Sequence, residues 1–227
     1  MSVPPQIGWF RTGEARFQGT LDGLADHELE SPSLLPGWSR RIVVAHVARN
    51  ADALVNLLTW ASTGVETPMY LSPDDRRRGI ADVASLGAAS LRAEVAEASN
   101  RLARAIDGLP AGAWDALVRT AKGRTVRAAE VPWMRCRETW IHAIDLDGTA
   151  SFADLPVDVS EALINDVLET LKSRGDSLGC TVVAGGRVLS SGATTVEGSL
   201  GEVTAWITGR PVRDASKDSF PRLPAWL

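Results

Sequence analysis

The sequence predicts an α+β protein, with a four-helix bundle over residues 1–150 and a small α+β domain over residues 151–227. Two observations support this division. Up to about residue 150, apolar residues recur at helical spacing in long segments. Later in the chain, short β-rich runs are divided by glycines. The segment SFADLPVD, which begins at Ser151, marks the predicted boundary.

Four long helices are expected in the first domain, as in a helical bundle. The apolar face of the first helix consists of Ile7, Phe10, Phe17, Leu21 and Leu24. That of the second consists of Val44, Val47, Ala51, Leu54 and Leu58, and that of the third of Leu91, Val95, Ala98, Leu102 and Ile106. Ser39 is the expected N-cap of the second helix, which ends near Gly64. The third helix is expected from the start signal at residues 72–75, SPDD, to Gly108. The fourth begins near Val131.

In the second domain, a helix is expected with Val159, Leu163, Val167 and Leu171 on one face. The runs CTVVA, RVLSS and ATTVE predict strands, with a hairpin at residues 185–186, Gly-Gly. SLGE at residues 199–202 predicts a capping box that opens a last helix. Gly209 is its expected end, so Arg210 lies just beyond it.

Composition narrows the classes of partner. The net charge of −4 and the pI of about 5.5 do not favour binding to nucleic acid or to an anionic membrane. No apolar segment approaches the roughly 20 residues that span a bilayer, and the opening residues carry no secretory signal. Cys136 and Cys180 form neither a disulfide framework nor a metal-type spacing. We therefore expect a cytoplasmic protein, and a monomer because no helix face is strongly apolar.

The stretch RETWIHAID, residues 137–145, carries the main candidate site. Glu138 and His142 lie four residues apart in an otherwise apolar helix, so they project from the same face. A carboxylate and an imidazole on a bundle helix are a known way to hold a metal. His46, on the inward side of the second helix, is the expected third ligand, whereas His27 lies in a polar stretch. Three protein ligands leave one coordination position open, as in catalytic zinc sites.

The same residues also have purely structural explanations. A Glu and a His at this spacing are more often a solvated pair than a metal site, and core histidines with satisfied hydrogen bonds are frequent. Asp145, close after His142, is either a partner for that imidazole or a surface acid. The residue pattern alone therefore leaves metal binding open.

Five stretches carry a resemblance to a known family: LLPGWSRRIVVAHVARNADAL, NLLTWASTGVETPMYLSPDDR, GRTVRAAEVPWMRCRETWIHAIDL, GSLGEVTAWITGR and the closing PAWL. They resemble the mycothiol-dependent maleylpyruvate isomerases, whose N-terminal domain is a DinB-like, metal-binding four-helix bundle. W-x-H-A-x-D-L and A-H-V mark the wider thiol-linked superfamily, whereas TGVETPMYLSPDDR is much more restricted. The match is loose between Leu86 and Ala121 and at the start of the second domain.

The resemblance implies the isomerisation of maleylpyruvate, a small dicarboxylate, to fumarylpyruvate in gentisate degradation, with zinc and mycothiol as cofactors. The family's zinc ligands fall on His46, Glu138 and His142, and its two functional arginines on Arg76 and Arg210. Zinc would favour the thiolate, whose reversible addition to the alkene lets the bond rotate. The arginines would bind the two carboxylates, which predicts an active site between the domains.

Two other functions share these residues. A mycothiol S-transferase would keep the thiol on an electrophilic substrate and would not need two arginines. A non-catalytic, metal-stabilised binding module would have a closed four-ligand site and no thiol dependence. Neither arginine is assigned by spacing alone: Arg76 begins the run at residues 76–78, which is typical of surface, and Arg210 suits a helix C-terminus.

Overall fold

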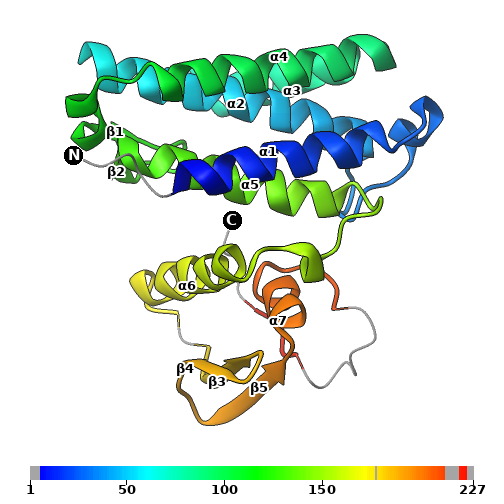
Figure 1. Ribbon diagram of the computed structural model, residues 1–227, viewed down its shortest axis with the longest axis vertical. Coiled ribbons are helices and arrows are strands. Elements are labelled where there is room, and N and C mark those ends of the chain that lie inside the picture. Colours follow the sequence, from blue (N-terminus) through cyan, green and yellow to red (C-terminus); the bar gives the residue numbers. More distant parts are fainter. Residues whose placement is uncertain (1–5, 177, 213–219, 224–227) are drawn as a thin grey trace. The chain divides into compact units, whose positions relative to one another are not determined.

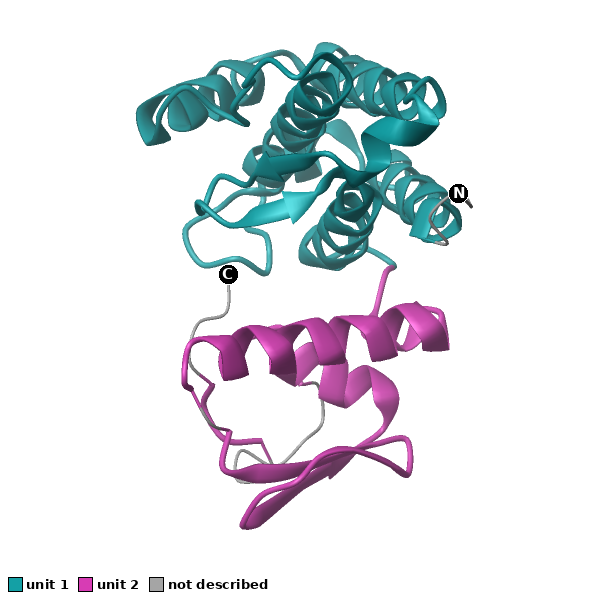
Figure 2. Ribbon diagram, turned by 90° about the vertical axis from the view of Figure 1, so that its left-hand side faces the viewer, with its two compact units in different colours: residues 1–149 teal, residues 150–227 magenta. Residues whose placement is uncertain are grey.

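A computed structural model of the chain describes residues 6–176, 178–212 and 220–223; the PAWL stretch, residues 224–227, lies outside them. The chain divides into two compact units, residues 1–149 and 150–227 (Figure 2). The first is a helical unit with one small hairpin, and the second combines helices with a three-stranded sheet. The predicted α+β class, with a helical bundle first, is confirmed.

The bundle in the first unit is built from the helices α1 (Gln6–Asp22), α2 (Arg40–Thr63), α4 (Ala88–Asp107) and α5 (Val131–Asp145) (Figure 1). α1 packs chiefly on α5, and α2 packs on both α4 and α5. The apolar stripes predicted from the sequence form the interior: Phe17, Leu54 and Leu102 are at most 1% exposed. Burial of these stripes is the main force that holds the four helices together.

The helix expected from residue 72 to Gly108 is in fact two helices, so that prediction was wrong. α3 (Pro73–Ala84) starts as predicted, because the Ser72 hydroxyl accepts a hydrogen bond from the Asp75 amide at 3.0 Å. It ends at Ala84, and Gly87 is the N-cap of α4. A glycine inside a helix costs about 1 kcal/mol relative to alanine, which favours a break there. The break lets α3 pack on α2 while α4 continues the bundle.

The connection between α4 and α5 contains a hairpin that the sequence pattern did not predict. Strands β1 (Leu117–Arg119) and β2 (Thr125–Arg127) pair antiparallel, with Val118 opposite Val126. These two valines are buried and their strand neighbours are exposed, the alternation of a half-buried ribbon. Strands of three residues are too short for this alternation to be distinguished in the sequence. Within the described residues, four short 3-10 helices also lie in the connections: η1 (Asp26–Glu30), η2 (Ala111–Asp115), η3 (Ala128–Glu130) and η4 (Phe152–Asp154).

The second unit contains α6 (Val157–Ser173), β3 (Cys180–Ala184), β4 (Arg187–Ser190), β5 (Thr194–Gly198) and α7 (Leu200–Ile207). The sheet order is β4-β3-β5, with β4 antiparallel and β5 parallel to the central strand. The predicted hairpin is present, with positive φ at Gly185 and Gly186. α7 packs on α6 and contacts β3 and β5, so the buried Val182 and Val196 belong to one small core.

The predicted capping box at the start of α7 is also present. The Ser199 amide donates to Glu202 Oε2 at 2.8 Å, and the Glu202 amide donates to Ser199 Oγ at 3.3 Å. Gly209, at φ 76°, follows the helix end as expected. These two signals place Arg210 directly after α7.

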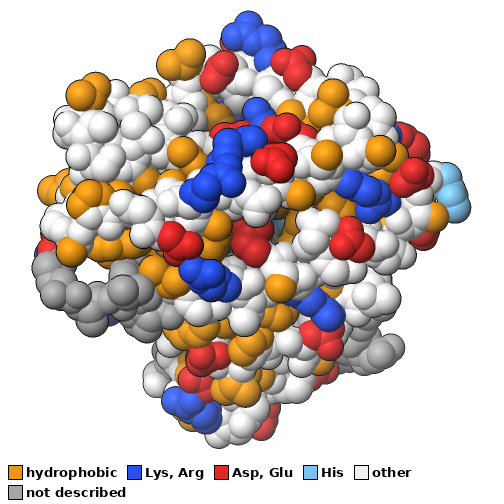
Figure 3. Space-filling model, turned by 45° about the horizontal axis from the view of Figure 1, so that its top comes forward, with side chains coloured by type: hydrophobic (Ala, Val, Ile, Leu, Met, Phe, Trp, Pro, Cys, Tyr) orange, Lys and Arg blue, Asp and Glu red, His pale blue; other side chains and the backbone are white. Residues whose placement is uncertain are grey.

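The surface carries charges of both signs. On the face in Figure 3, acidic and basic side chains are interspersed among neutral and apolar ones, without a large patch of one sign. No helix in the described parts of the chain is long and apolar enough to cross a membrane. Cys136 and Cys180 are not joined in a disulfide and both are buried, so they serve as small core residues.

Candidate metal centre

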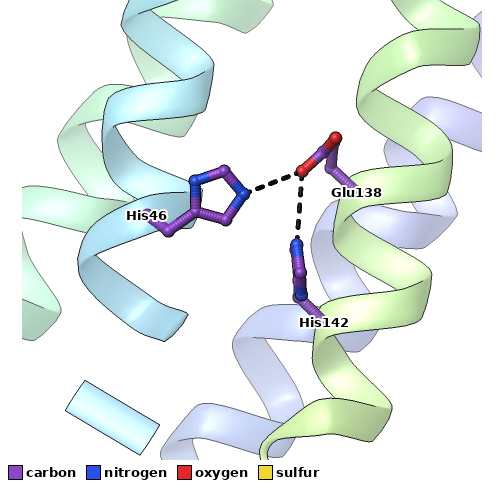
Figure 4. A group of neighbouring side chains, drawn as sticks. All are labelled: His46, Glu138 and His142. Atoms are coloured by element: carbon purple, nitrogen blue, oxygen red, sulfur yellow. Dashed lines mark hydrogen bonds and ion pairs between the residues drawn. The ribbon is translucent and has the colours of Figure 1, made fainter. Parts of the chain in front are cut away.

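Two packed helices of the bundle, α2 and α5, carry the three predicted ligands. Ser39 is the N-cap of α2, and its hydroxyl accepts a hydrogen bond from the Ile42 amide at 3.4 Å. This start places His46 in the second turn of α2. Glu138 and His142 lie one turn apart on α5 and point toward His46 (Figure 4). Because α2 and α5 are in contact, the three side chains meet inside the first unit.

The structure brings these three side chains close together. His46 Nε2 lies 3.0 Å and His142 Nε2 lies 3.3 Å from the same oxygen, Oε2 of Glu138. One donor atom from each residue lies within 4.8 Å of the other two. The two imidazole rings are nearly perpendicular, with centroids 4.9 Å apart. His46 and His142 are only 7% and 9% exposed, so this is not a solvated surface pair.

The protonation of the cluster follows from its burial and charges. Burial lowers the pKa of His46, although its hydrogen bond to Glu138 opposes the shift. Burial disfavours the ionised form of Glu138, but hydrogen bonds and positive charge from both imidazoles outweigh it and hold the pKa of that carboxyl well below its usual range. The cluster therefore contains a partly buried carboxylate anion, the form that binds a cation.

His142 has a second carboxylate partner. Its Nδ1 lies 2.8 Å from Oδ2 of Asp145, which is fully buried. Of the two explanations for Asp145, the imidazole partner is therefore correct and the surface acid is wrong. Burial disfavours the charged imidazole, but the hydrogen bonds to Asp145 and Glu138 outweigh it and raise the pKa of His142. A carboxylate beside Nδ1 favours a proton on that nitrogen, so that loss of the other proton frees the Nε2 lone pair for a metal ion.

The cluster fits a divalent metal ion. Two imidazole nitrogens and one carboxylate oxygen form a donor set that binds zinc and related metals. Glu138 lies in the cluster and Asp145 lies behind His142, so two carboxylates are present to balance the charge of a divalent ion. In the part of the chain that the structure describes, this is the group of three His, Cys, Asp or Glu residues close enough to hold a metal.

Arg76 lies at the edge of the cluster. Its Nη2 is 3.3 Å from Nδ1 of His46, and its guanidinium carbon lies 5.8 Å from the centre of the Tyr70 ring. Arg76 is half-buried, whereas Arg77 and Arg78 are exposed. The run at residues 76–78 is therefore not uniformly surface: its first arginine faces the candidate metal centre. This contact places a positive charge beside the site.

Arg210 lies in the second unit. It is half-buried after α7, and its Nη1 donates to the carbonyl of Thr208 at 2.7 Å. Such a hydrogen bond to the end of a helix is the structural role that the sequence offered as an alternative. A role of Arg210 in substrate binding stays a prediction.

Two residues near the site were not singled out from the sequence. Trp38 packs its ring edge-to-face against His46, with centroids 5.6 Å apart. Tyr70 lies against Arg76 and is the only tyrosine of the chain. Both belong to connections rather than to periodic helices, so helical spacing carried no signal for them. The uniqueness of Tyr70 was the one available clue.

Comparisons with known proteins show which proteins the chain resembles. A family model, described as the mycothiol maleylpyruvate isomerase N-terminal domain, matches residues 10–147. Two solved structures resemble the whole chain: a mycothiol-dependent maleylpyruvate isomerase, at 34% identity, and a histidine-to-alanine mutant of such an enzyme, at 33%. Each match has a TM-score of 0.92 and covers 100% of this chain and 98% of the other. Curated protein sequences give no match.

Proposed function

The chain belongs to the mycothiol maleylpyruvate isomerase N-terminal domain family, and we propose that it isomerises maleylpyruvate to fumarylpyruvate with mycothiol as the thiol cofactor and zinc as the metal. One observation supports this proposal most: a His-Glu-His cluster of low exposure lies in contact with an arginine, Arg76. A thiol-dependent isomerase of a dicarboxylate needs these two features side by side, a metal-binding group and an anion-binding group.

The three ligands would hold the metal at the protein's own donor atoms, Nε2 of His46, Nε2 of His142 and a carboxylate oxygen of Glu138. The bound metal would supply positive charge at an open position, which lowers the pKa of a thiol there. The protein contributes by keeping the ligands ready: Glu138 is ionised and Asp145 orients His142. Their low exposure strengthens the electrostatic interactions within the site.

The substrate explains the need for the arginines. Maleylpyruvate has two carboxylates and a cis double bond conjugated to a ketone, and that double bond is the barrier to rotation. Reversible addition of a thiolate turns it into a single bond, and elimination restores the alkene in the trans form. Arg76 would bind one carboxylate, because a guanidinium has five N–H donors, more than its contacts with His46 and Tyr70 use. Arg210 is proposed to bind the other.

The test is conversion of maleylpyruvate to fumarylpyruvate by the zinc-loaded protein, followed by ¹H NMR with and without mycothiol. Conversion that requires the thiol is the expected result. A stable thiol adduct that accumulates would instead identify an S-transferase. Absence of any reaction in a zinc-loaded, thiol-supplied sample would contradict the proposed activity. Protein stripped of metal with a chelator serves as the control for the metal.

A further inference from the structure

Tyr70 lies between α2 and α3, six residues before Arg76, and no other tyrosine occurs in the chain. The Arg76 guanidinium carbon sits 5.8 Å from the centre of its ring, within the range of a cation–π contact. The same arginine contacts His46 at 3.3 Å. Tyr70, Arg76 and the candidate metal ligand therefore form one continuous set of contacts.

The Tyr70 hydroxyl is protonated at neutral pH, as its surroundings indicate. Burial raises the pKa of Tyr70, the charge of Arg76 and a hydrogen bond with that arginine lower it, and the negative charge of Glu138 raises it. The geometry agrees with these influences, because the ring of Tyr70 lies beside Arg76 and Arg76 contacts His46. At neutral pH the hydroxyl keeps its proton and can donate a hydrogen bond.

The connection that carries Tyr70 is held in place from both sides. The Asn56 side chain donates to the carbonyl of Met69 at 3.4 Å, and Met69 itself is buried. Asp75 Oδ2 accepts a hydrogen bond from the amide of Leu71 at 3.2 Å. Side chains of α2 and α3 thus fix the residues before and after Tyr70. A donor held by such contacts can bind a ligand without first losing much conformational freedom.

We propose that Tyr70 and Arg76 together form a carboxylate-binding subsite beside the metal cluster, in which the Tyr70 hydroxyl donates a hydrogen bond to the substrate. The inference rests on the proposed function, which supplies the dicarboxylate. The charged guanidinium and the neutral hydroxyl provide adjacent donors, and a carboxylate has two oxygens to accept from them. The binding site thereby selects a substrate with a carboxylate at this position.

The first test is Tyr70→Phe, which keeps the ring beside Arg76 and removes the hydroxyl together with its hydrogen bond to that arginine. A hydrogen bond to a charged group is typically strong enough that KM for maleylpyruvate should rise about 10- to 100-fold. kcat should change less, because the contact is made in both the bound substrate and the transition state. Zinc content should stay at the wild-type level. A wild-type KM in Tyr70→Phe, together with a loss in Tyr70→Ala, would leave the ring as a support for Arg76 and would overturn the proposal.

The second test uses the single tyrosine as a probe and does not depend on turnover. Protein labelled with 3-fluorotyrosine gives one ¹⁹F resonance, from Tyr70 alone. Maleate, added to the zinc-loaded protein without thiol, should shift this resonance in a saturable way, and Arg76→Gln should weaken that response. Sodium chloride at equal ionic strength is the control. No saturable shift would overturn the subsite. A shift in a protein that fails to isomerise maleylpyruvate would support the subsite and reject the proposed activity.

Discussion

Nδ1 of His142 lies 2.8 Å from Oδ2 of Asp145, a fully buried carboxylate three residues along the same helix. A carboxylate behind a metal-binding imidazole fixes its tautomer and makes it more basic. The second imidazole of the cluster has a different neighbour, because Nδ1 of His46 faces Arg76 at 3.3 Å. The two histidines therefore differ in basicity, and most of the tuning of metal affinity is expected at His142.

Replacement of Asp145 by Asn should lower zinc affinity about 10- to 100-fold, since an outer carboxylate that orients a ligand typically contributes that much. The amide keeps the size of the side chain but loses the charge that makes His142 basic. Competition with a chromophoric chelator measures the Kd. Asp82→Asn is the matched control, because Asp82 is an exposed carboxylate on α3. Equal affinities of the Asp145 and Asp82 variants would contradict the role assigned to Asp145.

Zinc affinity should rise with pH through the raised pKa of His142. Below this pKa the imidazolium carries a proton on Nε2 and cannot bind the metal, and above it the lone pair is free. Since the shift is upward, the rise should extend above the ordinary histidine pKa of about 6.5. Burial lowers the pKa of His46, so that imidazole is already neutral in this range. In Asp145→Asn, the profile should move to lower pH; an unmoved profile would show that another group titrates.

Loss of a ligand should remove the metal. After desalting, His46→Ala and Glu138→Gln should retain less than about one tenth of the wild-type zinc, because two remaining donors bind weakly. Atomic absorption measures the zinc content, and isomerase activity should fall in parallel. His27→Ala is the control, since His27 is exposed on η1. Full zinc content and full activity in His46→Ala would show that the site is wrongly assigned.

Removal of the charge of Arg76 should weaken substrate binding. Arg76→Gln should lower kcat/KM for maleylpyruvate about 10- to 100-fold, the usual effect of one hydrogen bond to a charged group. Arg78→Gln, which changes an exposed arginine two residues along α3, should behave as wild type.

The same comparison applies to Arg210→Gln, with substitution of the exposed Arg174, Arg174→Gln, as its control. An unchanged kcat/KM in Arg210→Gln would confine that arginine to its hydrogen bond with Thr208.

The candidate metal cluster could be predicted from the sequence because it depends on helix geometry. Glu138 and His142 share a face whatever the rest of the fold does, since residues four apart on a helix always do. His46 could be added because its helix is strongly periodic, which identifies the inward face. Tyr70 and Trp38 could not be placed in this way, because they sit on connections whose path depends on tertiary packing.

Polar contacts between residues far apart in the sequence could not be predicted either. Glu14 on α1 accepts a hydrogen bond from Nε of Arg135 at 2.5 Å. Arg135 is fully buried on α5 and also donates to the carbonyl of Val47 on α2 at 2.6 Å. A buried charge of this kind needs its partners, but no local pattern shows that residues so far apart in sequence will meet. The break at Gly87 is a local signal of about 1 kcal/mol, too weak by itself to decide between one helix and two.

The close approach of α1 to α5 gives the last prediction. A Cβ on Gly13 would lie 2.5 Å from Oγ1 of Thr139 and 3.0 Å from Cδ1 of Trp140, both on α5. Gly13→Ala should therefore force the helices apart and lower the free energy of unfolding by about 1–3 kcal/mol. Gly19→Ala, on the same helix with nothing within 4 Å, should instead stabilise the protein by up to about 1 kcal/mol.

Urea unfolding of the metal-free variants, followed by far-UV circular dichroism, measures both effects against the wild type. Both substitutions change helix propensity equally. The difference between their changes in the free energy of unfolding therefore reports only the contact between α1 and α5. Thr139 and Trp140 directly follow Glu138, so movement of α5 at Gly13→Ala should also weaken zinc binding. Equal stabilities of the two variants would contradict the close contact between α1 and α5 at Gly13. The packing of α1 on α5 at this point would then not be what positions Glu138 relative to His46.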